Sequence, residues 1–517
     1  MRSTFMGLET ARRGMFTQQS ALHTTGHNIA NANTPGYTRQ RVNFQPTEPY
    51  PAAGMNRPQL PGQIGTGVEA GSVQRVRESF LDVQYRGENN KLGYWESRAE
   101  AYSKLEEVMN EPSDSGLAKT MDQFWQSLQD LAVNPTNSGA RSVVRQRGIA
   151  VAETFNYLNS TLKDIQADLK NEIGVTEKEI NSILNQVSKI NDQIGAVEPH
   201  GYLPNDLYDE RDRLIDQLST LVNIKVDYTP TGGNASTQAE GKVTITMITD
   251  ATRDELGVLV DPKGFNALKV DFDGQDGSVK TVTIAGTPYD FNDVKSSGKL
   301  KGLIESFGYE KTGGVTGIYP DMLRELDNLA FTFATEFNNV HKDGMSPNDI
   351  LNEEKAANSF FADSASDDTL ERTGLAGRLV IADAIVASLD NIATASGEPG
   401  SATIGDAQNI VKLADVINQK LNYAENNQQQ ANFRNYYEGV IGGMAVLSQE
   451  AVRLTQNSSA LRESVETRRQ SVSAVSLDEE MTNMIQFQHA YNASARMISL
   501  TDELLDKIIN GMGTGGR

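Results

Sequence analysis

The chain has 517 residues, of which 38% are apolar, and a formal net charge of −21 from 68 acidic and 47 basic residues. This length predicts several domains, and the acidic balance, for which solubility is the simplest explanation, disfavours binding to nucleic acid or to an anionic membrane. The complete absence of cysteine excludes disulfides, thiolate metal sites and cysteine nucleophiles.

The N-terminal stretch MRSTFMGLETARRGMF lacks the uninterrupted apolar core and the cleavage site of a secretory signal peptide. No apolar run of about 18 residues occurs, so the sequence predicts no insertion into a membrane. The lack of cysteine fits a protein that works outside the cell without oxidative folding. If the protein is exported, we expect a route that leaves its ends uncut.

A first helix is predicted up to about residue 30. Its apolar residues recur every seven positions, but the seam positions between them (Ala11, Gln18 and Thr25) are small or polar. Such a thin stripe cannot hold an isolated helix firmly, so we expect a partner helix. The apolar seam consists of Leu8, Met15, Leu22 and Ile29.

The first helix runs into an asparagine-rich stretch, HNIANANTPGYTRQRVNF, at residues 27–44. Asparagine is a poor helix former and a versatile hydrogen-bonding residue. The following proline pushes Thr34 toward an extended backbone, and Pro-Gly is a turn dipeptide. We expect a sharp turn into an extended segment; the alternative is an asparagine-rich helix end on a globular surface. The residues singled out are Asn28, Asn31, Asn33, Pro35, Gly36 and Tyr37.

Residues 45–67 are rich in proline and glycine and predict an exposed connection, after which residues 68–73 suit a short strand. Long helices are then expected. Residues 155–197 carry apolar residues at spacings of three and four, which predicts a helix of roughly 60 Å. Further helical periodicity in residues 207–221, 322–340 and 440–475 predicts helices that pack lengthwise as one bundle.

The middle of the chain has a different pattern. GKVTITMI alternates apolar and polar residues, and LKVDF with VKTVTI predicts a hairpin across an Asp-Gly loop. The loop, DFDGQDG, also invites a calcium interpretation, but Asp276 and Val282 replace the glycine and glutamate that an EF-hand requires. Residues 346–400 are rich in Ala, Ser and Asp and predict a smaller region of mixed structure.

A seven-residue repeat returns near the C-terminus. A second seam beside it, with Met481, Gln488 and Asp502, is interrupted by polar residues. We expect the two ends of the chain to pair in one coiled-coil-like layer; the alternative is two separate amphipathic helices on a globular core. The C-terminal seam consists of Leu477, Met484, Tyr491, Ile498 and Leu505.

The predicted fold is therefore mainly α with an inserted β-rich domain. It divides into terminal helices (1–44 with 476–517), a long-helix bundle (45–225 with 300–345 and 401–475), a β-rich domain (226–299) and a small appended region (346–400).

No catalytic constellation is recognisable. The five histidines form no HExxH pair, and neither a GxSxG elbow nor a complete phosphate loop is present. The carboxylates of YDERDRLID, with Asp209 and Asp212 near Arg211 and Arg213, suit a solvated helix face. We therefore predict no catalytic residue, no cofactor and no metal site, and hence no enzyme.

Three long motifs occur in a characteristic order: SALHTTGHNIANANTPGYTRQ at 20–40, GTGV at 65–68 with RVRESFLDVQYR at 75–86, and SVSAVSLDEEMTNMIQFQHAYNASARMISLTDELLDKIIN at 471–510. Together they resemble the bacterial flagellar rod, hook and hook-associated proteins. SVSAVSLDEE, LYDERDRLIDQL and LDNLAFTFATEFNNVHKDGM most resemble the hook-associated members of the hook–filament junction. Two departures are His27, where the family usually has Asn, and Ala474, where it usually has Gly.

The resemblance implies a structural adaptor of the extracellular flagellum, exported uncleaved through the flagellar type III route. It implies terminal helices that pack with other copies of the chain around a channel. The implied neighbours are the hook protein and the second junction protein. An export chaperone is expected on Met484, Tyr491, Ile498 and Leu505. The alternatives are another axial protein, such as a hook protein or flagellin, and a secreted enzyme on a flagellar scaffold.

Overall fold

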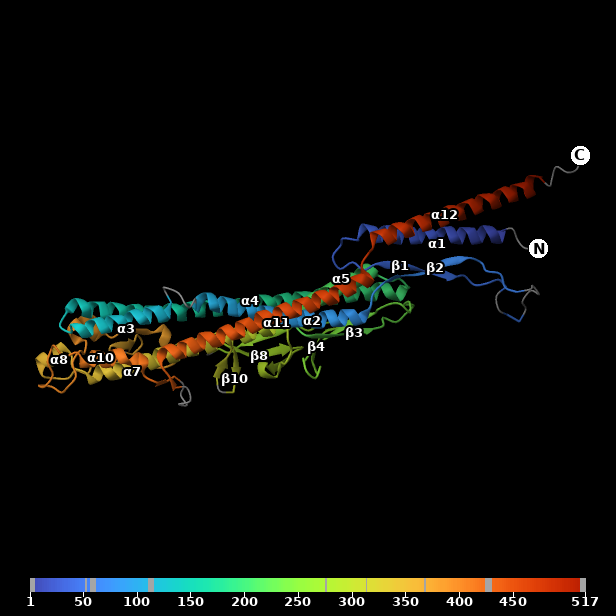
Figure 1. Ribbon diagram of the computed structural model, residues 1–517. Coiled ribbons are helices and arrows are strands. Elements are labelled where there is room, and N and C mark those ends of the chain that lie inside the picture. Colours follow the sequence, from blue (N-terminus) through green and yellow to red (C-terminus); the bar gives the residue numbers. More distant parts are fainter. Residues whose placement is uncertain are drawn as a thin grey trace, which may run out of the picture.

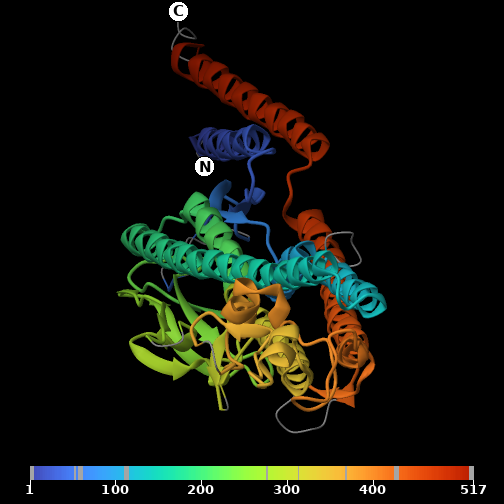
Figure 2. The same ribbon diagram turned by 90° about the vertical axis from the view of Figure 1, so that its left-hand side faces the viewer.

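The computed structural model describes residues 5–51, 54–55, 62–109, 116–274, 277–312, 314–366, 369–423 and 430–511. The molecule is elongated and mainly helical (Figures 1 and 2). Helices α1 (Phe5–Ala30) and α12 (Leu477–Asp506) lie together at one end, near both termini, and small, mostly antiparallel sheets lie along the middle. The predicted class, mainly α with an inserted β-rich part, is confirmed.

Four helices of the bundle, α4 (Ser138–Val197), α5 (Asn205–Leu221), α7 (Ile318–Asp343) and α11 (Phe433–Ser473), correspond to the segments predicted from periodicity, and the others were not predicted in this way. No helix within the described ranges has the length and apolar character needed to cross a bilayer. The other helices are α2 (Ser79–Met109), α3 (Leu117–Val133), α6 (Lys299–Phe307), α8 (Pro347–Asn352), α9 (Asp383–Ala387) and α10 (Gln408–Asp415).

Helix α4 is the axis of the bundle. It has 60 residues, which corresponds to a length of about 90 Å. It begins 17 residues before the predicted segment, at a cap where the Asn137 side chain accepts hydrogen bonds from the backbone N–H groups of Gly139 and Ala140. Most of the predicted apolar stripe is buried, and Thr176, the polar residue within it, is 2% exposed. Helices α3, α5, α6 and α7 pack on α4, while α11 packs along α2.

The far end of the bundle contains an aromatic cluster. Phe360 and Phe361, from the predicted appended region, pack against Phe337 of α7 with ring centroids 5.1 and 5.5 Å away. Phe124 and Phe333 belong to the same cluster. Residues 346–400 therefore share the main core, although their short elements show little periodicity. The strands in or near this region are β12 (Phe361–Asp363), β13 (Leu379–Ile381), β14 (Leu421–Asn422) and β15 (Gln430–Ala431).

Two sheets occupy the middle of the molecule. The first has the order β3-β4-β5-β6, and the second has the order β11-β10-β8-β7, with β9 paired to β8. The predicted hairpin is confirmed, because β7 and β8 are antiparallel with Val270 opposite Val282; its turn residues 275–276 lie outside the described residues. The strands are β3 (Ile224–Thr229), β4 (Lys242–Ile248), β5 (Glu255–Asp261), β6 (Gly264–Phe265), β7 (Lys269–Phe272), β8 (Val279–Ile284), β9 (Thr287–Asp290), β10 (Tyr309–Lys311) and β11 (Gly314–Thr316).

The sheets continue past residue 299, where the sequence suggested an end to the β-rich part. Helix α6 interrupts them, and β10 and β11 then complete the second sheet. Each of these two strands has three residues, which is too short to show an alternating pattern.

A strand pair accompanies the terminal helices. β1 (Gln40–Pro46) and β2 (Val68–Arg75) are antiparallel, with a bulge between Asn43 and Phe44. The pair contacts α1 and extends away from the bundle (Figure 1). The strand expected at residues 68–73 is therefore confirmed, and residue 44, the expected end of the terminal region, lies inside β1. The division into four domains remains a proposal.

Candidate assembly interface

The terminal helices α1 and α12 form an antiparallel pair. Near the end of α1, Asn28 lies beside Glu480 at the start of α12, with Nδ2 and Oε2 3.1 Å apart. Farther along the pair, a Cβ added at Gly14 would lie 3.2 Å from Oγ of Ser494. Glycine therefore allows close contact there, and the pairing predicted from the two heptad patterns is present in the folded chain.

The predicted seam residues are only partly covered by this pairing. Leu8, Met15, Leu22 and Ile29 are half-buried, as are Met484, Tyr491, Ile498 and Leu505, whereas Leu477 is 46% exposed. The fully buried positions of α1 are small or polar: Thr17, Ala21, Thr24, Thr25 and Asn28. A single partner helix thus leaves much of the apolar surface of both helices in contact with water.

Helix α12 also carries exposed apolar side chains outside the predicted C-terminal seam, and of these only Met481 was named, in the second seam. Five large apolar side chains on this helix and one from the helical segment that follows it, Lys507–Gly511, form an outer face, and each is about half exposed. Among the residues of α12, Glu480 alone is buried. Apolar surface of this extent marks an interaction site. The outer face consists of Met481, Ile485, Met497, Leu500, Leu504 and Ile508.

Asn28 fastens the end of α1 to two other elements. Its Nδ2 donates to the carbonyl oxygen of Gln40 at 2.8 Å and to Glu480, and its Oδ1 accepts from the backbone N–H of Gln40 at 3.0 Å and from the Tyr37 hydroxyl at 2.8 Å. The side chain is 1% exposed. This one amide therefore joins α1, β1 and α12.

The remaining turn residues have local roles. Asn31 donates to the carbonyl oxygen of His27 at 3.1 Å, and Gly36 has a φ of 82°, which glycine adopts without strain. Asn33 and Pro35 are exposed. The hydrogen bonds of Asn28 and Asn31 shown here lie within the chain, and a contact of the turn with other subunits stays a prediction. The turn lies beside α5, where a Cβ on Gly36 would meet Arg213 at 3.5 Å.

Arg39 adds a second link to the start of α12. Its guanidinium bonds to Glu480 at 2.8 Å and to Glu479 at 2.7 Å, and its backbone N–H donates to the carbonyl oxygen of Ser473 at 2.9 Å. The sequence reading missed this residue. The three acidic residues in the first turn of α12 were the available signal, because Arg39 pairs with two of them.

The prediction that YDERDRLID forms a solvated helix face is wrong. Asp209, Arg211 and Asp212 are 7%, 0% and 2% exposed. Strand β2 and the link that follows it bring Arg75 and Arg77 onto the carboxylates of this face of α5. Burial opposes ionisation of Asp212, but the surrounding guanidinium groups outweigh it and hold the pKa of this carboxyl well below its ordinary value.

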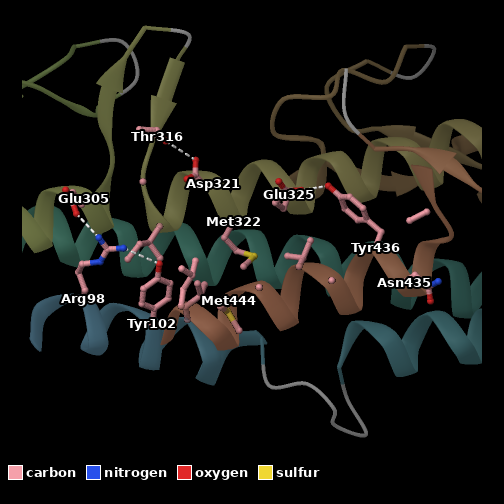
Figure 3. A pocket seen from close by; sticks show the side chains of 18 of the residues that line it. Arg98, Tyr102, Glu305, Thr316, Asp321, Met322, Glu325, Asn435, Tyr436 and Met444 are labelled. Carbon is pink, nitrogen blue, oxygen red and sulfur yellow. Dashed lines mark hydrogen bonds and ion pairs between the residues drawn. The ribbon is translucent and has the colours of Figure 1, made fainter. Parts of the chain in front are cut away.

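A cavity of about 910 Å³ lies between α2, α7 and α11 (Figure 3). Its polar side chains pair with one another: Arg98 with Glu305 at 2.9 Å, and the Tyr436 hydroxyl with Glu325. Met322 and Met444 form an apolar part of the wall. Within the described part of the chain, no group of three or more His, Asp or Glu side chains is placed to hold a metal ion. The cavity thus presents a paired, structural polar lining.

Three family descriptions match the chain in succession. Residues 8–38 match "Flagella basal body rod protein", residues 102–361 match "Flagellar hook-associated protein FlgK helical domain", and residues 468–511 match "Flagellar basal body rod FlgEFG protein C-terminal". The first and last matches cover most of α1 and α12, so the terminal pair is the part shared with rod proteins.

Individual relatives agree with these matches. The chain is 46% identical over 521 residues to flagellar hook-associated protein 1 of Bacillus subtilis, covering 100% of both chains, and 24% identical to that of Escherichia coli, covering 97% and 99%. The flagellar hook junction protein FlgK from Burkholderia pseudomallei has a similar fold, with a TM-score of 0.59 at 13% identity over 76% of this chain and 100% of that one. The chain therefore belongs to the flagellar hook-associated protein 1 family, the structural, non-enzymatic proteins of the extracellular hook–filament junction.

Proposed function

We propose that the chain is an adaptor that connects hook to filament, buffers their mechanical mismatch and is required for filament assembly. The observation that carries the proposal is the α1–α12 pair, which leaves the outer face of α12 exposed and both seams half-covered. Burial of this surface by neighbouring subunits supplies the driving force for assembly.

In the proposed assembly, α1–α12 pairs from many copies pack side by side around a channel. Neighbouring pairs bury the part of each seam that the partner helix leaves exposed. The turn at residues 31–37 lies at the border between this inner layer and the rest of each subunit. The proposed interface residues are Leu8, Met15, Leu22, Asn28, Ile29, Asn31, Asn33, Pro35, Gly36, Tyr37, Leu477, Met484, Tyr491, Ile498 and Leu505, together with the outer face.

The proposed partners are the hook protein on one side and the second junction protein on the other. Before assembly, an export chaperone covers Met484, Tyr491, Ile498 and Leu505, and the chain leaves the cell through the flagellar type III route. Because α1 half-covers these four side chains in the folded chain, the chaperone binds α12 before the two helices pair.

The test replaces Met497 and Leu504, which are 52% and 51% exposed, with aspartate. In the monomer both side chains contact water, so the thermal unfolding of the purified chain should not change. In cells, the double variant should lose filament attachment and motility, because two carboxylates would enter an apolar subunit contact.

Val411→Asp is the matched control. This side chain is 57% exposed on α10, far from the terminal helices (Figure 1). Motile cells with normal filaments are expected for it. Normal filaments from the Met497→Asp, Leu504→Asp chain would refute the proposed role of the outer face.

A further inference from the structure

The connection between the terminal helices and the bundle is polar. Among the described residues, the main apolar cluster runs from Trp95 to Ala451 and includes no side chain of α1, β1, β2 or α12. The contacts that cross to α5 are instead hydrogen bonds and ion pairs, such as the Thr38 N–H to Asp209 at 3.0 Å and Asn205 to the carbonyl oxygen of Val73 at 2.9 Å. Charged and polar groups therefore determine how the two parts meet.

A closed ring of three arginines and three aspartates lies where the chain passes between the bundle and the terminal helices, and Arg75 of β2 contacts it. Each side chain in the ring contacts two of opposite charge. The contacts are Asp212–Arg77 at 2.9 Å, Arg77–Asp82 at 2.6 Å, Asp82–Arg469 at 3.5 Å, Arg469–Asp216 at 2.6 Å, Asp216–Arg86 at 2.7 Å and Arg86–Asp212 at 3.3 Å.

The ring joins four segments at one point. Asp82 and Arg86 come from α2, Asp212 and Asp216 from α5, and Arg469 from the last turns of α11, just before the chain enters α12. Arg77 lies in the link between β2 and α2. The chain passes between the terminal helices and the bundle twice, from β2 into α2 and from α11 into α12. Both passages contribute a residue to the ring, Arg77 and Arg469.

Arg75 extends the ring into strand β2. It contacts Asp209 at 2.7 Å, Asp212 at 2.9 Å and also Glu240, which in turn pairs with Arg211 at 2.6 Å. The Arg75 side chain is 4% exposed. The five cations Arg75, Arg77, Arg86, Arg211 and Arg469 face the carboxylates of Asp82, Asp209, Asp212, Asp216 and Glu240. Glu466 adds a sixth carboxylate, 3.0 Å from Arg469, so every arginine of the group has a carboxylate partner.

Such a group specifies geometry more than it adds stability. The attraction between buried opposite charges is largely cancelled by the cost of removing them from water. Their contacts are directional, however, because a planar guanidinium aligns its N–H groups with carboxylate oxygens at fixed angles. Apolar packing is non-directional by comparison. A joint made of such pairs therefore resists rotation between the parts that it connects.

We propose that this charge ring is the joint that fixes the orientation of the terminal module (α1, β1, β2 and α12) relative to the bundle. Arg77 and Arg469 act as positioning residues, since each bridges two carboxylates carried by different segments. The inference goes beyond the proposed assembly of the terminal helices, because it concerns the geometry of each subunit before assembly.

The test measures a distance across the joint in the full-length chain. The chain contains no cysteine, so Ala70→Cys on β2 and Glu179→Cys on α4, both exposed, accept two nitroxide labels without competing sites. Electron–electron double resonance then gives the distribution of label separations. We expect one narrow peak for the labelled wild-type background.

Arg77→Lys and Arg469→Lys keep the charge but lose the planar fork that spans two carboxylates. Each variant should broaden the distance distribution at least twofold or shift its maximum, while the thermal unfolding of the bundle stays close to wild type. Arg324→Lys is the matched control, because Arg324 lies on α7 and pairs with Asp321 in an exposed contact outside the ring. Its distribution should match that of the wild type.

Two outcomes would overturn the proposal. A broad distribution in the wild-type background would show that the joint has no fixed orientation. Unchanged narrow distributions in both lysine variants would show that orientation is fixed by something other than the ring. Neither result depends on whether the outer face of α12 drives assembly, so the two proposals are tested independently.

Discussion

Asn28 and His341 are both polar side chains that hold distant segments together inside the chain. Asn28 can do this because an amide has two donor hydrogens and an acceptor oxygen. Its side chain binds the backbone of β1, the hydroxyl of Tyr37 and the carboxylate of Glu480. An aspartate could accept the same hydrogen bonds but could donate none. The position therefore requires an amide.

His341 is 2% exposed at the end of α7, and both ring nitrogens are used. Nδ1 donates to the carbonyl oxygen of Asn358 at 2.7 Å, and Nε2 accepts from the backbone N–H of Ala393 at 3.0 Å. Protonation of Nε2 would destroy the second bond. The neutral ring thus connects α7 to two segments of the 346–400 region.

This arrangement predicts a pH dependence of stability. Burial lowers the pKa of His341 to about 4, from 6.5. Between these values the unfolded chain binds a proton that the folded chain does not, so the contribution of His341 is present above pH 6.5 and is lost as the pH falls toward 4. The full loss is about 3 kcal/mol of unfolding free energy.

The measurement is urea unfolding at several pH values, with a probe of the far end of the bundle. His341→Gln should lose the part of the acid destabilisation that lies between pH 6.5 and 4. His200→Gln, which alters an exposed histidine, should retain it. Equal pH profiles for wild type and His341→Gln would contradict the prediction.

At the scale of elements, the long helices were predictable because one face of each is buried continuously. In α4 the spacing of three and four residues located the helix, and only its first 17 residues were missed, since their buried positions include Arg141 and Gly148. Strands of three residues such as β10 and β12 could not be recognised, because an alternating pattern needs more positions.

The polar contacts were not predictable from local patterns. Arg86 and Asp216 are 130 positions apart, and Arg469 and Asp216 are 253 positions apart, so nothing near Asp216 indicates its partners. An acidic stretch on an amphipathic helix is ordinarily a solvated face. The heptad seams located the terminal pair, but periodicity alone could not reveal which apolar side chains of α12 remain exposed.

The crossing of α2 and α5 supplies a prediction at this scale. A Cβ at Gly93 would lie 2.2 Å from the carbonyl oxygen of Thr220 in the backbone of α5, whereas nothing lies within 4 Å of a Cβ at Gly87 on the same helix. Gly93→Ala should therefore destabilise the chain by about 1–3 kcal/mol through overpacking. Gly87→Ala should stabilise it by up to about 1 kcal/mol, because alanine favours the helix.

Chemical denaturation of the two variants gives the comparison directly, since both introduce the same methyl group into α2. If Gly93→Ala left the free energy of unfolding unchanged or raised it, α2 and α5 could move apart without cost, and the close crossing would not contribute to stability.

Helix α12 carries the C-terminal seam and most of the outer face. We expect substitutions in the seam to weaken chaperone binding and substitutions in the outer face to weaken assembly. A peptide of residues 477–510 should bind the export chaperone, and Ile498→Asp with Leu505→Asp should abolish binding, because large apolar anchors at seven-residue spacing suit a helix-in-groove contact. Calorimetric titration measures the affinity. The chain truncated after Leu477 is the complementary test, and undiminished affinity there would place the chaperone site on another helix.

At the scale of the whole molecule, the chain consists of an apolar bundle and a terminal module that is joined to it by charges and hydrogen bonds. The main apolar cluster includes no side chain of the terminal helices. The α1–α12 pair has little buried apolar surface of its own. The stability of the two parts should therefore be separable, because most of the contacts that join them are hydrogen bonds and ion pairs.

Leu22→Asp tests this separation. The side chain is half-buried on α1 and lies outside the main cluster, so a carboxylate there weakens the α1–α12 pair without opening the bundle. Hydrogen exchange should accelerate at least tenfold in α1, α12 and β1, while α4 and α7 keep their protection and the melting temperature of the bundle changes by no more than about 1 °C. Leu351→Asp, a substitution of the same kind at a site that is 69% exposed on α8, is the control and should leave exchange in the terminal module unchanged. If Leu22→Asp lowered the melting temperature of the bundle by several degrees, the terminal helices would belong to one cooperative unit with it, because even 1 kcal/mol shifts a domain of 150–250 residues by about 2–4 °C.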